Sequence, residues 1–294
     1  MSNELLTTSV GSMPNPAYLT KARGQASRGE ISRESLDVLD RQATEYWIRT
    51  QEQLDLDILV DGEMNRGDMV TYFSENMAGF EISGLVRSYG NRYYRKPVAV
   101  GPVGRASNIT VEWWQFAQSL TDRPVKGMLT GPYTIADWSF NEHYRTREEF
   151  VMALAELVRD EAQALEAAGA KYIQIDEPAA STRPEEMELA SRALGVVTQG
   201  LSAITITHIC YGDFTKVFSE LTSLPIDMLD LEFANAEYAL IEDFRRNPSE
   251  KMVAMGVTDV HTHIAESVEQ IRDGIKKGLE VFQPEQLYIG PDCG

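Results

Sequence analysis

The chain alternates between short apolar runs and longer amphipathic stretches. Eight short runs, rich in Val, Ile and Leu, read as buried strands: residues 5–10, 57–60, 125–129, 172–175, 203–207, 228–231, 252–255 and 287–289. Strands that alternate with helices pair in parallel and are covered by those helices. The pattern therefore predicts an α/β protein, and the strand number predicts a (β/α)8 TIM barrel. A doubly wound open sheet is the alternative with the same order of elements.

Capping signals place several of the helices between these strands. Ser32 marks a helix start after a basic loop near residues 21–28, and Thr146 with Glu149 forms a capping box. Gly169 stands where a helix that follows this box needs a left-handed C-terminal residue. Further helical stretches are predicted at residues 68–77, 214–221 and 264–279.

One segment breaks the alternation. Residues 79–105 contain two runs of β-branched and aromatic residues, with glycines between them. This composition predicts an antiparallel hairpin near residues 80–105. We expect the hairpin to be an insertion in the barrel rather than a second domain.

Polar residues follow the C-terminal ends of several different strands. In a parallel barrel these ends share one face, which is where catalytic groups gather, whereas an open sheet would spread them along a line. Their distribution therefore favours the barrel. The residues are Ser12, Glu63, Asp176, His208, Glu232, His261 and Cys293.

Four of the residues near strand ends form a set that suits zinc. His208 and Cys210 are two positions apart at one strand end, so their side chains point the same way. Glu232 ends the next strand, and Cys293 follows the last strand. One imidazole, two thiolates and a carboxylate make a tetrahedral zinc site.

The charge of this set indicates what the zinc would do. Zn²⁺ with two thiolates, a carboxylate and a neutral imidazole carries a net charge of −1, so it acidifies water only weakly. It suits the capture of a substrate thiol as a nucleophilic thiolate. Glu232 is the hardest ligand and the easiest for a sulfur atom to displace. A closed structural zinc site is the alternative, but the usual paired Cys-x₂₋₄-Cys spacing is absent from the sequence.

Composition narrows the functional classes further. Lys and Arg number 27 and Asp and Glu 45, a net charge of −18, which argues against nucleic acid or an anionic membrane as a partner. We expect no membrane span, because apolar runs approaching ~20 residues are absent. We expect no signal peptide, because the first residues lack a basic segment and a long apolar one. Two cysteines make no disulfide framework, and a cytoplasmic location is expected.

The chain resembles the C-terminal catalytic barrel of cobalamin-independent methionine synthase almost from end to end. The motifs that carry the resemblance occur in the family's order. They are Thr8-Ser9-Val10-Gly11-Ser12-Met13-Pro14, Asp61-Gly62-Glu63-Met64-Asn65-Arg66-Gly67-Asp68, Lys126-Gly127-Met128-Leu129-Thr130-Gly131-Pro132, Trp138-Ser139-Phe140, Ile173-Gln174-Ile175-Asp176-Glu177-Pro178-Ala179, Thr207-His208-Ile209-Cys210, Asp259-Val260-His261 and Pro291-Asp292-Cys293-Gly294.

The resemblance implies a zinc-dependent homocysteine S-methyltransferase, an enzyme of methionine biosynthesis on a (β/α)8 barrel. His208, Cys210, Glu232 and Cys293 fall on the family's zinc ligands. By the same resemblance, Glu63 and Asp176 hold the homocysteine ammonium, and Val10 and Ser12 bind its carboxylate. His261 matches a histidine that donates a proton during transfer, and Trp138 matches the aromatic residue on which the pterin of a folate donor stacks.

Two departures from the family concern the methyl donor. The full-length family has a second, N-terminal barrel that helps to bind the folate polyglutamate tail, and this chain has no counterpart to it. After Pro178-Ala179 the family continues Leu-Arg-Glu, whereas this chain reads Ala180-Ser181-Thr182. The lost acidic residue lies near the donor in the family. We therefore expect poor use of polyglutamyl methyltetrahydrofolate. Two classes of methyl donor stay open, methyltetrahydrofolate and a corrinoid protein or another carrier, with a companion protein as a further partner.

The chain ends one residue after Cys293. We expect residues 1–294 to form one catalytic domain that lacks the barrel's last helix, because no helical stretch follows the eighth strand. On that view the arm that carries Cys293 is loosely held, and the zinc site is incomplete.

Other functions fit parts of the sequence. A zinc alkyltransferase acting on another thiol, such as coenzyme M, would use the same ligands, but Glu63 and Asp176 favour an amino-acid thiol over a sulfonate. Porphyrin decarboxylation, known from a related barrel family, gives no reason for the zinc set. A non-catalytic metal-binding barrel that needs a partner is the remaining alternative.

Overall fold

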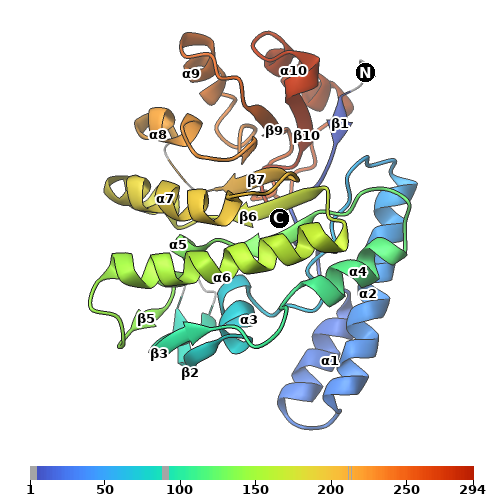
Figure 1. The fold of residues 1–294 in the computed structure, drawn as a ribbon. Coiled ribbons are helices and arrows are strands. Elements are labelled where there is room, and N and C mark those ends of the chain that lie inside the picture. Colours follow the sequence, from blue (N-terminus) through green and yellow to red (C-terminus); the bar gives the residue numbers. More distant parts are fainter. Residues whose placement is uncertain (1–4, 88–92, 211, 213) are drawn as a thin grey trace.

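The computed structural model describes residues 5–87, 93–210, 212 and 214–294, and is built around a curled parallel sheet (Figure 1). Seven strands form this sheet in the order β1-β10-β9-β8-β7-β6-β4. All of its ladders are parallel. The strands are β1 (Leu6–Thr7), β4 (Gly127–Thr130), β6 (Tyr172–Asp176), β7 (Ile204–Ile209), β8 (Met228–Leu231), β9 (Met252–Gly256) and β10 (Leu287–Gly290).

The predicted strand at residues 57–60 appears only as isolated parallel bridges. Thr8 bridges Ile58, and Leu59 bridges Val125, so this segment touches both edges of the curled sheet. At Leu59 the pairing is a single bridge. The Leu59 N–H donates to the Pro124 carbonyl, and the Leu59 carbonyl accepts from the Lys126 N–H. The bounds of the seven other predicted strands lie within three residues of where the sequence places them.

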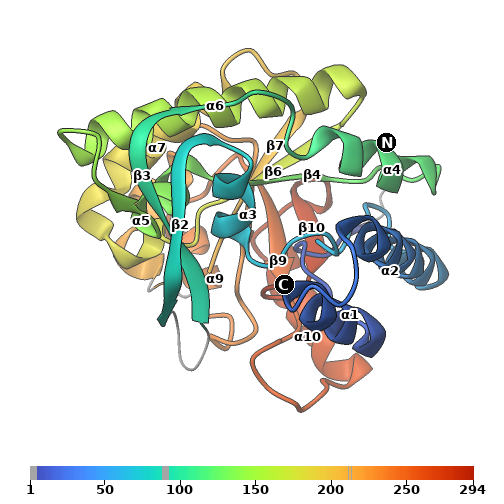
Figure 2. The same ribbon diagram turned by 90° about the horizontal axis from the view of Figure 1, so that it is seen from below.

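Helices cover the outside of the curled sheet (Figures 1 and 2). The α-helices are α1 (Ala17–Ser27), α2 (Arg33–Gln53), α3 (Met69–Glu75), α4 (Val111–Ser119), α5 (Pro132–Asp137), α6 (Arg147–Ala168), α7 (Met187–Thr198), α8 (Phe218–Thr222), α9 (Leu240–Arg246) and α10 (Val268–Leu279). Short 3-10 turns lie at η1 (Ala180–Thr182), η2 (Pro184–Glu186), η3 (Phe214–Lys216) and η4 (Pro284–Gln286). Within the described residues, no helix is long and apolar enough to cross a membrane.

The capping signals are confirmed at the helices they mark. The Ser32 hydroxyl accepts from Ser35 N–H at the start of α2, and Thr146 and Glu149 form both bonds of the capping box of α6. Gly169 ends α6 with a φ of 110°, a left-handed conformation that glycine adopts without strain.

Two predictions about the helices were wrong. Residues 21–28, read as a basic loop, belong largely to α1, which buries just Leu19 and Ala22. So small an apolar face leaves little periodicity for the sequence to display. The predicted helix at 214–221 is broken into η3 and α8.

The predicted hairpin insertion is present as a small mixed sheet. β2 (Ala78–Arg87) and β3 (Tyr93–Gly104) pair antiparallel, and β5 (Phe140–Asn141) joins β3 in parallel. Figures 1 and 2 place β2 and β3 beside α3, at the edge of the molecule away from α10. The Tyr94 hydroxyl donates to the Trp138 carbonyl at 3.0 Å, which ties the hairpin to the end of α5.

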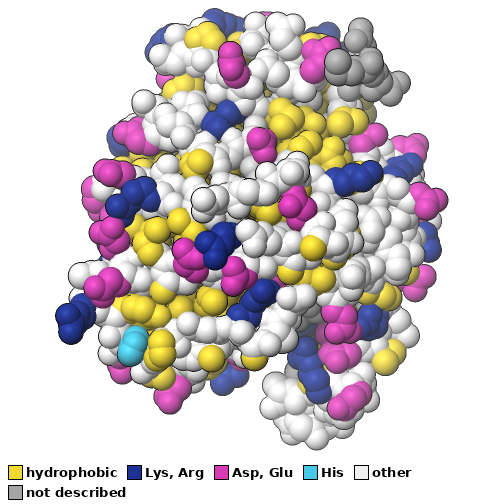
Figure 3. Space-filling model, in the orientation of Figure 1, with side chains coloured by type: hydrophobic (Ala, Val, Ile, Leu, Met, Phe, Trp, Pro, Cys, Tyr) yellow, Lys and Arg dark blue, Asp and Glu magenta, His cyan; other side chains and the backbone are white. Residues whose placement is uncertain are grey.

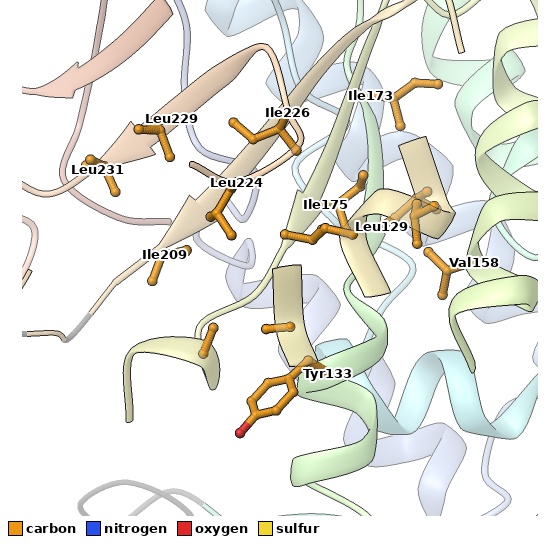
Figure 4. Close-up of a cluster of buried hydrophobic side chains, with 14 of the residues drawn as sticks. Leu129, Tyr133, Val158, Ile173, Ile175, Ile209, Leu224, Ile226, Leu229 and Leu231 are labelled. Carbon is orange, nitrogen blue, oxygen red and sulfur yellow. The ribbon is translucent and has the colours of Figure 1, made fainter. Parts of the chain in front are cut away.

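The two faces of the curled sheet have different cores. Outward-facing side chains such as Ile173, Ile175 and Leu229 belong to one buried cluster, which also contains Tyr133 and Val158 from the covering helices (Figure 4). A smaller cluster fills the inside of the curl and contains Ile58, Ile206, Met228, Ala254 and Tyr288.

Strand alternation then decides which residues face the inside of the curl. Positions two residues apart share a face, so His208 follows Ile206 inward, and Asp230 follows Met228 inward. The inner layer is therefore apolar near the strand starts and polar near the carboxyl ends. This layering places the predicted site residues at one end of the curl.

Candidate metal centre and substrate site

Three predicted metal ligands converge at the carboxyl ends of the strands. His208 lies in β7, Cys210 directly follows β7, and Cys293 lies three residues beyond β10. Their ligand atoms all lie within 4.8 Å of one another, and His208 and Cys210 are buried. One imidazole nitrogen and two sulfur atoms at this spacing suit a tetrahedral metal such as zinc.

The orientation of His208 tests whether a metal fits. Its Nδ1 lies 3.3 Å from Oδ1 of Asp230, the residue directly opposite on β8. Its Nε2 is buried and, among the described residues, forms no hydrogen bond of ordinary geometry, although the ring interacts with the nearby Cys293 thiol. A carboxylate on one ring nitrogen is the usual way to aim the other at a metal. The unsatisfied Nε2 therefore fits a metal ligand.

The two thiols interact strongly with each other. A hydrogen bond from Cys210 lowers the pKa of Cys293, and the nearby His208 lowers it further against the effect of burial. The same hydrogen bond, together with burial, raises the pKa of Cys210. Cys293 is thus the thiol that ionises first, and a thiolate is the form that binds metal.

Glu232, the predicted fourth ligand, lies beside the three-residue cluster. It is buried, and its charge contributes to the raised pKa of Cys210. Its Oε1 lies 3.0 Å from Nε2 of His261, and its Oε2 accepts from the Asn235 side chain at 3.4 Å. Two residues predicted to act in catalysis, Glu232 and His261, are therefore in contact. The role of Glu232 as a ligand stays a prediction.

The arm that carries Cys293 is anchored, which corrects the expectation of a loosely held arm. Asp292 is fully buried, and its carboxylate accepts from the backbone N–H groups of Phe233, Ala234 and Asn235 at 2.7–3.0 Å. Its own N–H donates to the Thr258 carbonyl. Asp292 therefore fixes Cys293 relative to the loop that follows Glu232.

We predict that Asp292→Ala weakens metal binding. Losing the anchor of a ligand-bearing arm is expected to lower zinc affinity roughly 10- to 100-fold, as for other groups that support metal ligands. Competition with a chromophoric chelator would measure the change. Asp227→Ala is the matched control, because Asp227 accepts from Thr205 N–H and Oγ1 before β8 begins, at the other end of the strand from Glu232. Equal zinc affinity in the two variants would contradict the prediction.

Glu63 lies in a tight turn after the bridging segment. Gly62 and Glu63 both have positive φ, 76° and 58°, and the Glu63 N–H donates to Oδ1 of Asp61. A non-glycine residue in the left-handed region is uncommon, and such residues cluster at functional sites. Nη1 of Arg66 lies 3.3 Å from Oε1 of Glu63 and partly balances its charge.

Asp176 ends β6 and is a buried acid near the partly buried Glu63. Burial raises the pKa of Asp176 to about 6 and that of Glu63 to about 7. The charge of Asp176 adds to the shift of Glu63, as does Cys293, whereas Arg66 opposes it. His208 and Gln174 oppose the shift of Asp176. A buried carboxylate and a partly buried one that repel each other form a favourable site for a ligand cation.

Val10 and Ser12 lie where three segments meet. Val10 is buried, and its carbonyl accepts from Lys126. Ser12 is exposed and bridges Gly62 in parallel. The chain end is also close, since a Cβ on Gly294 would lie 3.0 Å from the Ser12 nitrogen. The first strand, the Glu63 turn and the Cys293 arm thus adjoin.

Trp138 follows α5 and is partly buried against the main hydrophobic core. Its carbonyl is held by Tyr94. Its place in a donor site stays a prediction.

Several residues that shape the site were not predicted. Asp230 contacts His208, Asp292 anchors the arm that carries Cys293, and Lys126 and Gln174 contact the segments predicted to bind the substrate. Lys126 and Gln174 had a visible signal, because each is polar inside an apolar strand, where a buried polar side chain needs a specific partner. The partners of Asp292 are backbone groups 57 to 59 residues away, which no local pattern reveals.

A large cavity of about 750 Å³ lies apart from this site, between α1, α2, α3 and α4. Its arginines Arg23, Arg33, Arg41 and Arg95 are paired with Asp40, Asp37, Glu112 and Glu75. Figure 3 likewise shows basic and acidic side chains interspersed over the face it displays. A fifth acidic residue of the lining, Asp68, accepts from the N–H groups of Val70 and Thr71. The described lining of the cavity thus offers no unpaired arginine and includes none of the predicted site residues.

Comparison with known proteins identifies the same relationship over nearly the whole chain. A family model described as "Cobalamin-independent synthase, Catalytic domain" matches residues 5–294. A methionine synthase of Pyrococcus furiosus is 38% identical, and the match covers 99% of this chain and 86% of that protein. A 5-methyltetrahydropteroyltriglutamate–homocysteine methyltransferase of Ralstonia pickettii is 39% identical, but this chain spans just 39% of its length.

A solved structure agrees with these relatives. The B12-independent methionine synthase of Shewanella sp. W3-18-1, in complex with selenomethionine, superposes with a TM-score of 0.88 at 29% identity. The match covers 99% of this chain and 91% of that one. The chain therefore belongs to the family of cobalamin-independent synthase catalytic domains.

Proposed function

We propose that this chain is a methyltransferase that moves a methyl group to the thiol of homocysteine and so forms methionine. The main support is that Glu63 and Asp176 lie within electrostatic range of Cys293 and His208, respectively. A substrate with an ammonium at one end and a thiol at the other matches this arrangement of acids beside a thiophilic cluster. The names of the Pyrococcus and Shewanella relatives support the same reaction.

We infer that zinc is the metal and that His208, Cys210, Cys293 and Glu232 hold it. The unsatisfied Nε2 of His208 and the ready ionisation of Cys293 support this ligand set. When bound, zinc would act as a Lewis acid that keeps a substrate thiol ionised at neutral pH.

The remaining residues would bind the amino-acid part of homocysteine. Glu63 and Asp176 would hold its ammonium, and the backbone and hydroxyl near Val10 and Ser12 would bind its carboxylate. Because these groups come from separate strand ends, they would orient the thiol toward the metal cluster. A substrate held at three points reacts faster because fewer orientations remain to be searched.

In the reaction, the homocysteine sulfur would form a bond to the methyl carbon as the bond from that carbon to the donor breaks. The electron pair of the broken bond stays with the donor, which takes up a proton if it leaves as a base. His261, in contact with Glu232, is placed to supply that proton. Trp138 would offer a stacking surface for a planar donor.

We further propose that the donor is not polyglutamyl methyltetrahydrofolate but a corrinoid-bound or other methyl carrier. No carboxylate occurs between Glu177 and Glu185, and the Ser181 hydroxyl in this segment donates to the backbone carbonyl of Cys210. These two features favour loss of the acidic donor contact that the family has in this segment.

An assay with the two donors side by side tests the reaction and the donor together. Zinc-loaded protein and homocysteine should form methionine faster with methylcobalamin than with methyltetrahydropteroyltriglutamate. A higher rate with the triglutamate would contradict the donor proposal alone. Absence of methionine with both donors, together with no calorimetric binding of homocysteine, would contradict the proposed reaction.

We also infer that the curled sheet is a (β/α)8 barrel in which residues 57–62 supply the strand that completes the seven-stranded sheet, between β1 and β4. The bridges of this segment to Thr8, Ser12 and Val125 support that view.

A further inference from the structure

Lys126 is a buried lysine inside the curl, directly before β4. It is 1% exposed, and its Nζ donates to three oxygens: the Ser9 carbonyl at 2.5 Å, the Val10 carbonyl at 3.1 Å and Oε1 of Gln174 at 2.5 Å. An ammonium group has three N–H donors, whereas a neutral amine has two. The three acceptors therefore match the charged form.

A buried charge at this position has a cost that an apolar residue would avoid. The inner layer nearer the strand starts is filled by side chains such as Ile206 and Met228 without any such cost. Burial lowers the pKa of Lys126, and the nearby carboxylates of Asp230, Asp176 and Glu63 oppose that shift and so favour its positive charge. Lys126 is thus a counterion beneath an acidic site as well as a donor to its backbone.

Gln174 carries the influence of Lys126 to Asp176. Because lysine can only donate, the Gln174 oxygen must face Lys126, and its amide nitrogen must face the other way. That nitrogen donates to Oδ1 of Asp176 at 2.7 Å. Gln174 is completely buried, so it cannot exchange these partners for water. Lys126 therefore fixes the orientation of the Gln174 side-chain amide, so that its NH2 group donates to Asp176.

We propose that Lys126 is a positioning residue for the amino-acid part of the substrate. Through its bonds to Ser9 and Val10 it holds the segment that leads to Ser12, and through Gln174 it holds Asp176. One side chain thereby fixes the spacing between the groups assigned to the homocysteine carboxylate and those assigned to its ammonium. This inference rests on the proposed function, and Lys126 itself does not touch the substrate.

Calorimetry of zinc-loaded Lys126→Met with two thiols tests the proposal. L-homocysteine carries an ammonium and a carboxylate, whereas 1-propanethiol presents a thiol alone. The Kd for homocysteine should rise roughly 10- to 100-fold, as when a buried charged group loses its hydrogen bonds, while the Kd for 1-propanethiol and the zinc content stay unchanged. An unchanged Kd for homocysteine, or an equal loss for both thiols, would overturn the proposal.

Two further variants keep the test sharp. Gln174→Met removes the link to Asp176 but keeps the lysine charge, so it should weaken homocysteine binding selectively even if Lys126→Met fails to fold. If Gln174→Met bound homocysteine like the wild type, the link to Asp176 would be wrong. Lys251→Met is the matched control, because Lys251 directly precedes β9 and its Nζ donates to the Ile226 carbonyl at 2.6 Å. It should leave both affinities unchanged, and a selective loss there would also overturn the proposal.

The wild-type measurement separates the two hypotheses. Wild-type protein that binds homocysteine, with variants that bind it equally well, would overturn the role of Lys126 alone. Wild-type protein that fails to bind homocysteine would overturn the proposed function, and the role of Lys126 would fall with it.

Discussion

Cys293→Ser should remove bound zinc and lower the rate of methyl transfer on the order of 1,000-fold, well beyond the effect of losing a group that merely supports a ligand. Cys293 ionises first among the two thiols, so it supplies the thiolate that a metal meets most readily. A serine hydroxyl stays protonated at neutral pH and is a harder, weaker ligand for zinc. Metal content by mass spectrometry and methionine formation would measure the two losses.

The serine variant separates metal binding from folding. Asp292 anchors the arm through its own carboxylate, so the arm should keep its place when the neighbouring thiol is lost. The midpoint of thermal unfolding of Cys293→Ser should therefore match that of wild-type protein stripped of zinc by a chelator. A variant that keeps one zinc per chain and the wild-type rate would show that Cys293 is not a ligand.

The cluster of candidate metal ligands could be predicted because each of its residues stands next to an apolar run that can be recognised as a strand. His208 and Cys210 stand at the end of one apolar run, and Cys293 follows another, so a parallel sheet brings all three to one end. The structure adds how they are held. Asp230 orients His208 from the opposite strand, a contact that depends on the register of β7 against β8. The register between two strands cannot be predicted from the sequence of either strand alone.

The elements that sequence reasoning misjudged are those with weak amphipathic patterns. Helix α1 buries two residues, so its sequence resembles a basic loop. The segment at Ile58 and Leu59 has the composition of a strand. It forms just two isolated bridges there, one to Thr8 and one to Val125. Local composition predicted its burial correctly, whereas the length of its ladder depends on both flanking strands.

The acidic character of the proposed substrate site follows from the residues that surround Glu63 and Asp176. Glu63 has a partial counterion in Arg66, whereas Asp176 receives a neutral amide hydrogen bond from Gln174. Unlike Glu63, Asp176 therefore has no side-chain cation bonded directly to it among the described residues, and a bound ligand ammonium would fill that role. This difference makes Asp176 the more sensitive of the two positions to replacement.

Asp176→Asn should weaken homocysteine binding at least about 100-fold at pH 8, because removing one partner of a buried ion pair costs roughly 3 kcal/mol or more. Asparagine keeps an oxygen for the Gln174 amide and removes only the charge, so the fold should be retained. The pKa of Asp176 is raised to about 6, so at pH 8 the wild-type carboxylate is ionised and the comparison is between a charged and a neutral group. Asp227→Asn removes an equivalent charge before the start of β8 and should leave the affinity unchanged. Calorimetry with L-homocysteine would measure both, and equal affinities for wild type and Asp176→Asn would mean that the ammonium binds elsewhere.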